Sequence, residues 1–133
     1  MIVTGTAFLN HDMEWLEKIR REHNFKLVIA DITSTLACFG LWGLRSREIL
    51  QAITTYDMSH SNFPFMHSRE IMIAGAKVRA TRITYVGELG WELYVPVANA
   101  EAVWAELIST GRECGMKVCG YRASESLRIE KGY

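Results

Sequence analysis

The sequence has no net charge, few cysteines and no long apolar run, and each of these absences excludes a class of protein. Fifteen Lys and Arg residues are balanced by fifteen Asp and Glu residues. Such a balance argues against a nucleic-acid binder, which needs clustered cations to neutralise phosphates. No apolar run approaches the roughly 20 residues that a membrane-spanning helix requires. We therefore expect neither nucleic acid nor a membrane as a partner.

Disulfide, metal and nucleotide signatures are also missing. The three cysteines, Cys38, Cys114 and Cys119, cannot all pair within the chain, and their spacing does not suggest zinc. We expect reduced, buried thiols, which fit a bacterial cytoplasm or a mitochondrial matrix. The G-x-G-x-x-G, P-loop, H-E-x-x-H and G-x-S-x-G motifs do not occur. The sequence thus predicts no flavin or metal site and no catalytic residue of its own.

What the chain does have is enough apolar sequence for one core. It contains 133 residues, of which 49% are hydrophobic, and this suffices for a single domain. Apolar and β-branched runs predict strands at residues 1–8, 26–33, 35–43, 69–75, 77–87, 91–96 and 117–120. Helical spacing predicts helices at about 10–22, at 46–53 with Ser46 as the cap, at 99–110 ending at Gly111, and at 123–133.

The order of these elements indicates the fold class. Several strands follow one another without a helix between them, which favours antiparallel pairing. We therefore predict an α+β fold, a mostly antiparallel sheet with helices packed on it. The strand at 35–43 is so apolar that we expect it to be buried on both faces, and residues 54–64 are expected to form a loop.

The segment RITYVGELGWELYVP, residues 82–96, carries the most chemical information. Strand alternation places Trp91, Leu93 and Val95 on one face and Glu92 and Tyr94 on the other. One interpretation is an ordinary exposed hairpin in which Glu92 pairs with Arg82, a contact worth only about 0 to 1 kcal/mol.

The alternative interpretation is a binding site for a flat heterocycle. A carboxylate can accept two parallel hydrogen bonds from adjacent N–H donors, and a neighbouring tyrosine can supply a stacking face. Glu92 is a better anchor than Glu88, because a strand fixes its direction whereas Glu88 lies in a turn flanked by glycines.

Residues 82–96, together with GYRASESLRIEKGY from Gly120 onward, resemble the tetrahydrofolate-binding aminomethyltransferase family of the glycine cleavage T-protein. LWGLRSREIL and FPFMHSREIMIAG add support, and the likeness is greatest to the C-terminal folate domains of sarcosine dehydrogenase and dimethylglycine dehydrogenase. In this family a folate-binding glutamate lies on the strand after a Gly-Glu turn, and Glu92 matches that position. The resemblance also implies folate contacts from Tyr85, Leu93 and Tyr94, with Glu88 as a weaker candidate.

The chain departs from the family pattern at one position and at its ends. Ser124 stands where T-proteins carry an arginine for the glutamate tail of folate, so we expect no tail recognition there. Arg128 is expected to form a structural ion pair or a helix-end contact. The catalytic aspartate of the family lies upstream of the region that resembles MIVTGTAF, and a C-terminal barrel follows the LRIEKGY-like segment. Residues 1–133 are thus expected to form a partial folate-binding domain that is inactive alone.

The resemblance implies the folate-binding portion of a protein of one-carbon metabolism. Such a protein transfers a one-carbon unit from a glycine-, sarcosine- or dimethylglycine-type amine to tetrahydrofolate, and a flavin dehydrogenase domain is the partner that it implies. A non-catalytic folate-binding or regulatory module of the same fold is an alternative. A third hypothesis is a half-domain that self-associates through uncovered strand edges.

Overall fold

The computed structural model describes residues 1–133 and divides into two units, Met1–Ile32 and Thr33–Tyr133. Unit 1 contains a short 3-10 turn, η1 (Thr6–Phe8), and one helix, α1 (Leu9–Glu22), which has no buried residue. The helix confirms the prediction for residues 10–22. The strands predicted at 1–8 and 26–33 are wrong. A β-branched run becomes a strand only where a neighbouring strand takes up its backbone hydrogen bonds, and unit 1 offers none.

Unit 2 contains a four-stranded antiparallel sheet. It begins with η2 (Thr33–Thr35), and its strands are β1 (Leu36–Trp42), β2 (Ser68–Ile73), β3 (Ala76–Thr81) and β4 (Gly90–Pro96). Their order in the sheet is β1-β4-β3-β2, and every neighbouring pair is antiparallel. The predicted α+β class with a mostly antiparallel sheet is confirmed.

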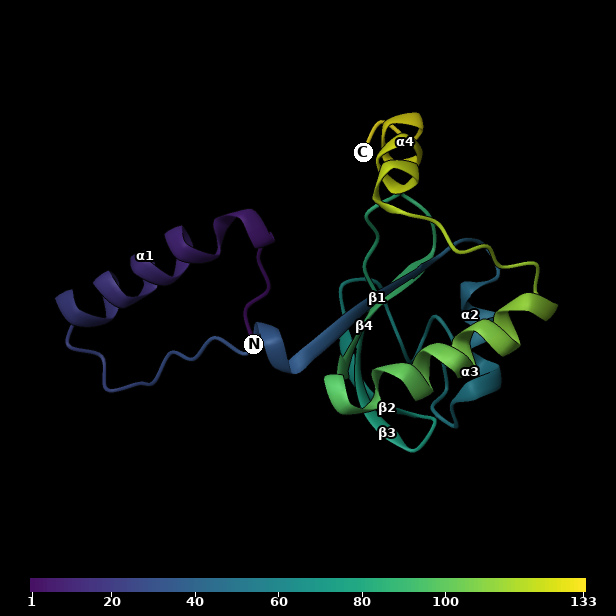
Figure 1. Cartoon of the computed structure of the whole chain (residues 1–133), viewed down its shortest axis with the longest axis horizontal. Helices are drawn as coiled ribbons and strands as arrows, with labels where there is room; N and C mark the ends of the chain where they lie inside the picture. Colours follow the sequence, from purple (N-terminus) through teal and green to yellow (C-terminus); the bar gives the residue numbers. More distant parts are fainter. The chain divides into compact units, whose positions relative to one another are not determined.

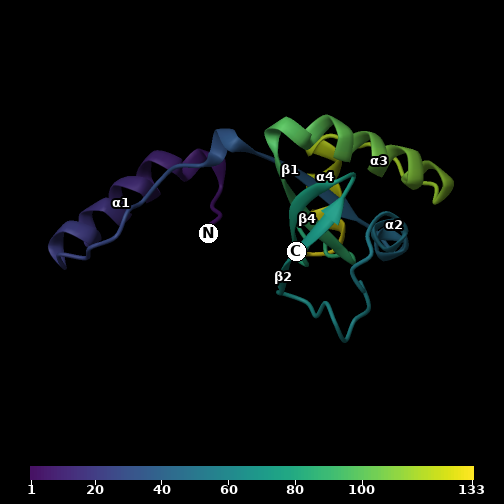
Figure 2. The same cartoon turned by 90° about the horizontal axis from the view of Figure 1, so that it is seen from below.

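The helices of unit 2 are α2 (Ser46–Ile53), α3 (Ala100–Glu113) and α4 (Tyr121–Glu130), with the 3-10 turn η3 (Val97–Asn99) before α3. Helices α2 and α3 lie against each other beside the sheet, while α4 lies near the β3–β4 connection (Figures 1 and 2). The core between α2, α3 and the sheet includes the fully buried side chains of Trp91, Leu93, Val95, Val78 and Leu50. Every second residue of β4 therefore points into the core, as alternation predicts. No helix is long and apolar enough to cross a bilayer.

Two predicted helix boundaries are corrected by contacts with other segments. Ser46 is the first residue of α2 and makes no cap for it; its hydroxyl donates to the carbonyl of Leu89 at 3.0 Å. Gly111 does not end α3 but lies within it, where it is buried. The side chain of Met116 packs so close to Gly111 that a Cβ there would overlap with it. The chain turns away from the end of α3 at Gly115, which has a φ of +74°.

The strand predicted at 77–87 ends at Thr81, so β3 and β4 are joined by a loop at residues 82–89 and not by a tight hairpin. The main chain of Arg82 still pairs with its neighbour segment, because its N–H donates to the carbonyl of His67 at 2.9 Å. Beyond it the chain leaves the sheet, and Gly87 adopts a φ of +75°. The strand predicted at 117–120 is absent, while the loop at 54–64 is confirmed.

The expected burial of β1 and of the thiols is also wrong. Cys38 and Gly40, on the face of β1 turned away from the core, are exposed. Cys119 is exposed as well, and Cys114 is half-buried. A strand of small and apolar residues is thus packed on one face only, and its other face is open.

We expect Leu93→Ala to lower the free energy of unfolding of the chain by about 2 to 5 kcal/mol, because it leaves a cavity in the core. Urea unfolding followed by circular dichroism measures the change. Val97→Ala is the control: Val97 is 60% exposed, and its truncation should change stability by no more than about 0.5 kcal/mol. Equal effects of the two substitutions would contradict the placement of Leu93.

Candidate functional site

The face of the sheet turned away from the core brings together several polar and aromatic side chains, and we call it the open face. The strand register places Cys38 opposite Tyr94, Gly40 opposite Glu92, and Thr81 opposite Glu92 on its other side. Directly paired residues project their side chains from the same face. The open face is therefore centred on Glu92, in the middle of β4.

Glu92 carries a carboxylate that no cation neutralises. The hydroxyl of Tyr94, two residues along the strand, donates a hydrogen bond to it. Burial and this hydrogen bond raise the pKa of Tyr94, so the phenol stays protonated and keeps donating. No ion pair involves Glu92, and the residue is only half-buried. The carboxylate therefore retains hydrogen-bonding capacity toward a ligand.

The predicted ion pair between Glu92 and Arg82 does not form. The guanidinium of Arg82 donates from Nη1 to the carbonyl of Phe63 at 2.8 Å and to Nδ1 of His60 at 3.0 Å. It also contacts the ring of Trp91, which belongs to the core face of β4. Adjacent strand residues point to opposite faces, so an arginine that packs on Trp91 is directed away from Glu92.

An aromatic surface beside Glu92 was not predicted from the sequence. The indole of Trp42 lies over Gly40 and Gly90, because a Cβ at either glycine would overlap with the Trp42 ring. Its Nε1 donates to the carbonyl of Ile83 at 3.3 Å. A glycine within a strand often marks such a close approach. The two glycines in β1 and β4 were thus the signal that could have revealed it.

The thiol of Cys38, opposite Tyr94 on the open face, has a raised pKa. Burial raises its pKa to about 11, and the negative charge of Glu92 adds to the rise. Although the residue as a whole is exposed, the direction of the shift keeps the thiol protonated, and a protonated thiol is a poor nucleophile.

Tyr85 and Glu88, the other predicted polar site residues, lie in the β3–β4 loop and are tied to the C-terminal segment. The hydroxyl of Tyr85 donates to the carboxylate of Glu125 in α4. The carboxylate of Glu88 forms an ion pair with Nζ of Lys131 at 2.8 Å. Arg128 donates to Glu125 at 3.0 Å, which confirms its predicted ion pair. The loop is thus fixed by α4 through polar contacts.

The structure therefore brings together Glu92 and Tyr94 but separates them from the other candidates. Leu93 lies between them in sequence, yet its side chain is fully buried in the core. Tyr85 and Glu88 lie in the β3–β4 loop and make their polar contacts with Glu125 and Lys131. No group of three or more His, Cys, Asp or Glu side chains is placed to hold a metal ion.

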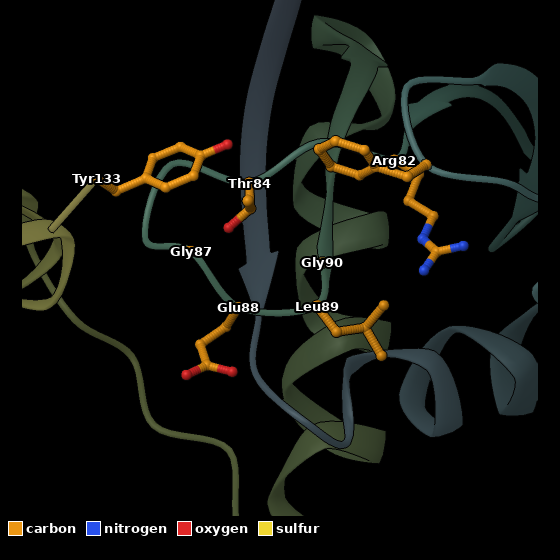
Figure 3. A pocket seen from close by; sticks show the side chains of 8 residues that line it. Arg82, Thr84, Gly87, Glu88, Leu89, Gly90 and Tyr133 are labelled. Atoms are coloured by element: carbon orange, nitrogen blue, oxygen red, sulfur yellow. The ribbon is translucent and has the colours of Figure 1, made fainter. Parts of the chain in front are cut away.

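A cavity of about 440 Å³ lies at the β3–β4 loop. Its lining includes Phe65, Arg82, Thr84, Glu88, Leu89 and Tyr133. Figure 3 shows the Arg82 guanidinium and the Glu88 carboxylate well separated along this lining, with Gly90 between them. The cavity and the open face are different places, because Arg82 turns to the core side of the sheet whereas Glu92 projects from the other.

A family model, the GCVT N-terminal domain, matches residues 1–133. The chain belongs to this family. The resemblance seen in residues 82–96 and 120–133 is thereby confirmed for the whole chain.

Relatives of this GCVT N-terminal domain are parts of longer proteins. Mitochondrial sarcosine dehydrogenase of Mus musculus is 36% identical over 132 residues, covering 99% of the chain but 14% of that protein. Mitochondrial dimethylglycine dehydrogenase of Homo sapiens is 32% identical over 133 residues, covering all of the chain and 15% of that protein. An aminomethyltransferase of Caldanaerobacter subterraneus subsp. tengcongensis is 30% identical, and the chain covers 34% of it. The chain thus spans only a small part of these relatives.

The fold of this GCVT N-terminal domain also occurs in a heterotetrameric sarcosine oxidase from Corynebacterium sp. U-96, solved in complex with pyrrole 2-carboxylate. The TM-score is 0.65 at 16% identity, and the match covers 79% of the chain and 53% of the oxidase chain. At this identity the likeness supports the fold alone.

The two glycines beneath Trp42 should differ in their tolerance of a side chain. Gly90→Ala places its Cβ against the backbone of Leu41 and of Trp42, and we expect a loss of about 1 to 3 kcal/mol of stability because backbone cannot move aside. Gly40→Ala meets only the outer ring of the Trp42 indole, so it should cost less and shift the indole N–H resonance. Urea unfolding and ¹H–¹⁵N spectra measure both effects. Equal stability losses would contradict the arrangement.

The contact between Tyr85 and Glu125 should be visible in the titration of Glu125. The hydrogen bond from Tyr85, and next that from Arg128, lower the pKa of Glu125. A depressed carboxyl pKa stabilises the fold above the ordinary glutamate pKa, and this stabilisation is lost as the pH falls through the folded-state pKa. We expect Tyr85→Phe to raise the Glu125 midpoint in a ¹³C carboxyl titration, whereas Tyr133→Phe should leave it in place. An unchanged midpoint in Tyr85→Phe would refute the contact.

Proposed function

We propose that the chain is the tetrahydrofolate-binding portion of an aminomethyltransferase-like protein of one-carbon metabolism. The observation that carries the proposal is the unpaired carboxylate of Glu92 between two aromatic side chains on the open face. A pterin ring is flat and presents adjacent N–H donors on one edge. A carboxylate that accepts two parallel hydrogen bonds is complementary to that edge, and Tyr94 and Trp42 offer aromatic surface beside it.

The residues present fit the ligand in three respects. A central strand fixes the face from which the side chain of Glu92 projects. The hydrogen bond from Tyr94 occupies part of the carboxylate and orients the rest. Gly40, paired with Glu92, lets the indole of Trp42 lie flat over β1, so an aromatic surface stands beside the carboxylate. These features support Glu92 as the anchor, with Tyr94 as its positioning partner.

The remaining site residues have weaker support. Tyr85 and Glu88 belong to a loop that α4 holds in place, and we propose that they border the folate site through this loop. The side chain of Leu93 is in the core, so its folate contact stays a prediction for its main chain only. None of these residues is proposed to be catalytic.

Tetrahydrofolate supplies the nitrogen that accepts the one-carbon unit, so the part played by this chain is to bind and orient. Holding two reactants in a productive geometry contributes about 7 to 11 kcal/mol to the most favourable intramolecular reactions. Because the chain spans 14% and 15% of the two dehydrogenase relatives, we propose that other segments provide the catalytic aspartate and a flavin domain. We accordingly expect no turnover from residues 1–133 alone.

The amine donor is proposed to be of the glycine, sarcosine or dimethylglycine type; the names of two relatives support the last two, and the resemblance to the glycine cleavage T-protein suggests the first. The proposed compartment is a bacterial cytoplasm or a mitochondrial matrix. A non-catalytic folate-binding or regulatory module remains the alternative, and formation of methylene-tetrahydrofolate by the full-length protein would exclude it. Strands β1 and β2 are the edges of the sheet, and self-association through them stays a prediction.

We expect Glu92→Gln to weaken tetrahydrofolate binding to the full-length protein about 10- to 100-fold, because one of two charge-assisted hydrogen bonds is lost and an amide N–H faces a donor. Isothermal titration calorimetry measures the affinity. The control is Glu101→Gln, at an exposed position of α3, which should bind like the wild type. Unchanged affinity in Glu92→Gln, with an unchanged near-UV spectrum, would refute Glu92 as the anchor.

A further inference from the structure

Four buried polar side-chain atoms have no hydrogen-bond partner in the structure, and their residues are close together. They are Nε of Arg47, Nε of Arg82, Oγ1 of Thr84 and Nε1 of Trp91. The guanidinium carbons of Arg47 and Arg82 lie 5.9 and 5.8 Å from the centroid of the Trp91 ring. Arg82 and Thr84 both line the cavity at the β3–β4 loop. Most buried polar atoms in proteins are satisfied, so a cluster of unpaired donors indicates that acceptors are missing.

The two arginines also lack counterions. Neither forms an ion pair with any carboxylate of the chain. Arg82 is only 8% exposed, and burial together with the positive charge of Arg47 lowers its pKa. An arginine stays protonated nonetheless. Positive charge is therefore concentrated beside Trp91, and a buried charge without a partner is costly.

The acidic residue of the cavity, Glu88, does not neutralise the charge of the two arginines. Glu88 lines the same cavity, but its carboxylate is paired with Lys131 at 2.8 Å. Figure 3 shows it pointing away from the guanidinium of Arg82. The end of the cavity at Arg82 is thus cationic, while Phe65 and Leu89 make part of its wall apolar.

We propose that this cavity binds a small organic carboxylate, with the carboxylate at the guanidinium of Arg82 and the carbon chain against Phe65 and Leu89. An oxyanion brings only acceptors, which matches a set of donors without partners. Arg47 strengthens the site through its charge. The groups that would hold this carboxylate are Arg82, Phe65 and Leu89 and not Glu92 or Tyr94, so the inference does not rest on the proposed folate anchor.

The test uses side-chain N–H resonances of the 133-residue chain at constant ionic strength. Acetate and butanoate are titrated while the Arg Nε–H and Trp indole signals are followed in ¹H–¹⁵N spectra, with sodium chloride and butanamide as matched probes. We expect saturable shifts of Arg82 Nε–H with both carboxylates and several-fold tighter binding of butanoate. Butanamide and chloride should give no saturable shift. Shifts that grow linearly, or equally with chloride, would overturn the proposal.

Variants separate the charge from the apolar wall. Arg47→Gln should weaken acetate and butanoate alike, and Leu89→Ala should remove the preference for butanoate while acetate binding persists. Arg112→Gln, at an exposed position of α3, is the control and should bind both as the wild type does. Because Arg82 also holds the Phe63 carbonyl, Arg82→Lys is examined for folding first; a folded Arg82→Lys with undiminished carboxylate binding would also overturn the proposal.

Discussion

The pairing of β4 on both of its edges is the constraint on which the rest of the structure depends. β1 lies on one side and β3 on the other, so the backbone of β4 cannot rotate without breaking two ladders. Alternation then assigns every side chain of the strand to a face. The same seven residues supply both Trp91 and Val95 to the core and Glu92 to the open face. Burial of the apolar half is what holds the carboxylate in place.

The two faces of this strand use their neighbours differently. On the core side, Trp91 packs edge-on against Phe63 at 5.9 Å between centroids and receives two guanidiniums. On the open side, Gly40 and Gly90 have no side chain, and the indole of Trp42 packs directly over them. Aromatic rings thus mark both faces, but the rings on the core side are enclosed whereas those on the open side stay half-buried.

Features that arise from local pattern were predictable from the sequence, and features that arise from distant contacts were not. That Glu92 and Tyr94 project from the same face follows from the two-residue period of a strand, and α1 follows from the helical spacing of its apolar residues. The strand expected at 26–33 fails because β propensity expresses the fit to a neighbouring strand. Tyr85 meets Glu125 across forty positions, and Trp42 meets Gly90 only through the register of β1 on β4. No single-segment pattern contains either contact.

The carbonyl of Leu89 accepts two hydrogen bonds, one from the N–H of Gly43, which precedes α2, at 2.8 Å and one from the hydroxyl of Ser46, the first residue of α2, at 3.0 Å. The β3–β4 loop and the first turn of α2 therefore share one oxygen atom. Any ligand that orders this loop must also favour the helical form of that turn, and by reciprocity a substitution that frays the turn must reduce affinity at the loop. Local unfolding of a helix that touches no ligand would then set part of the binding free energy.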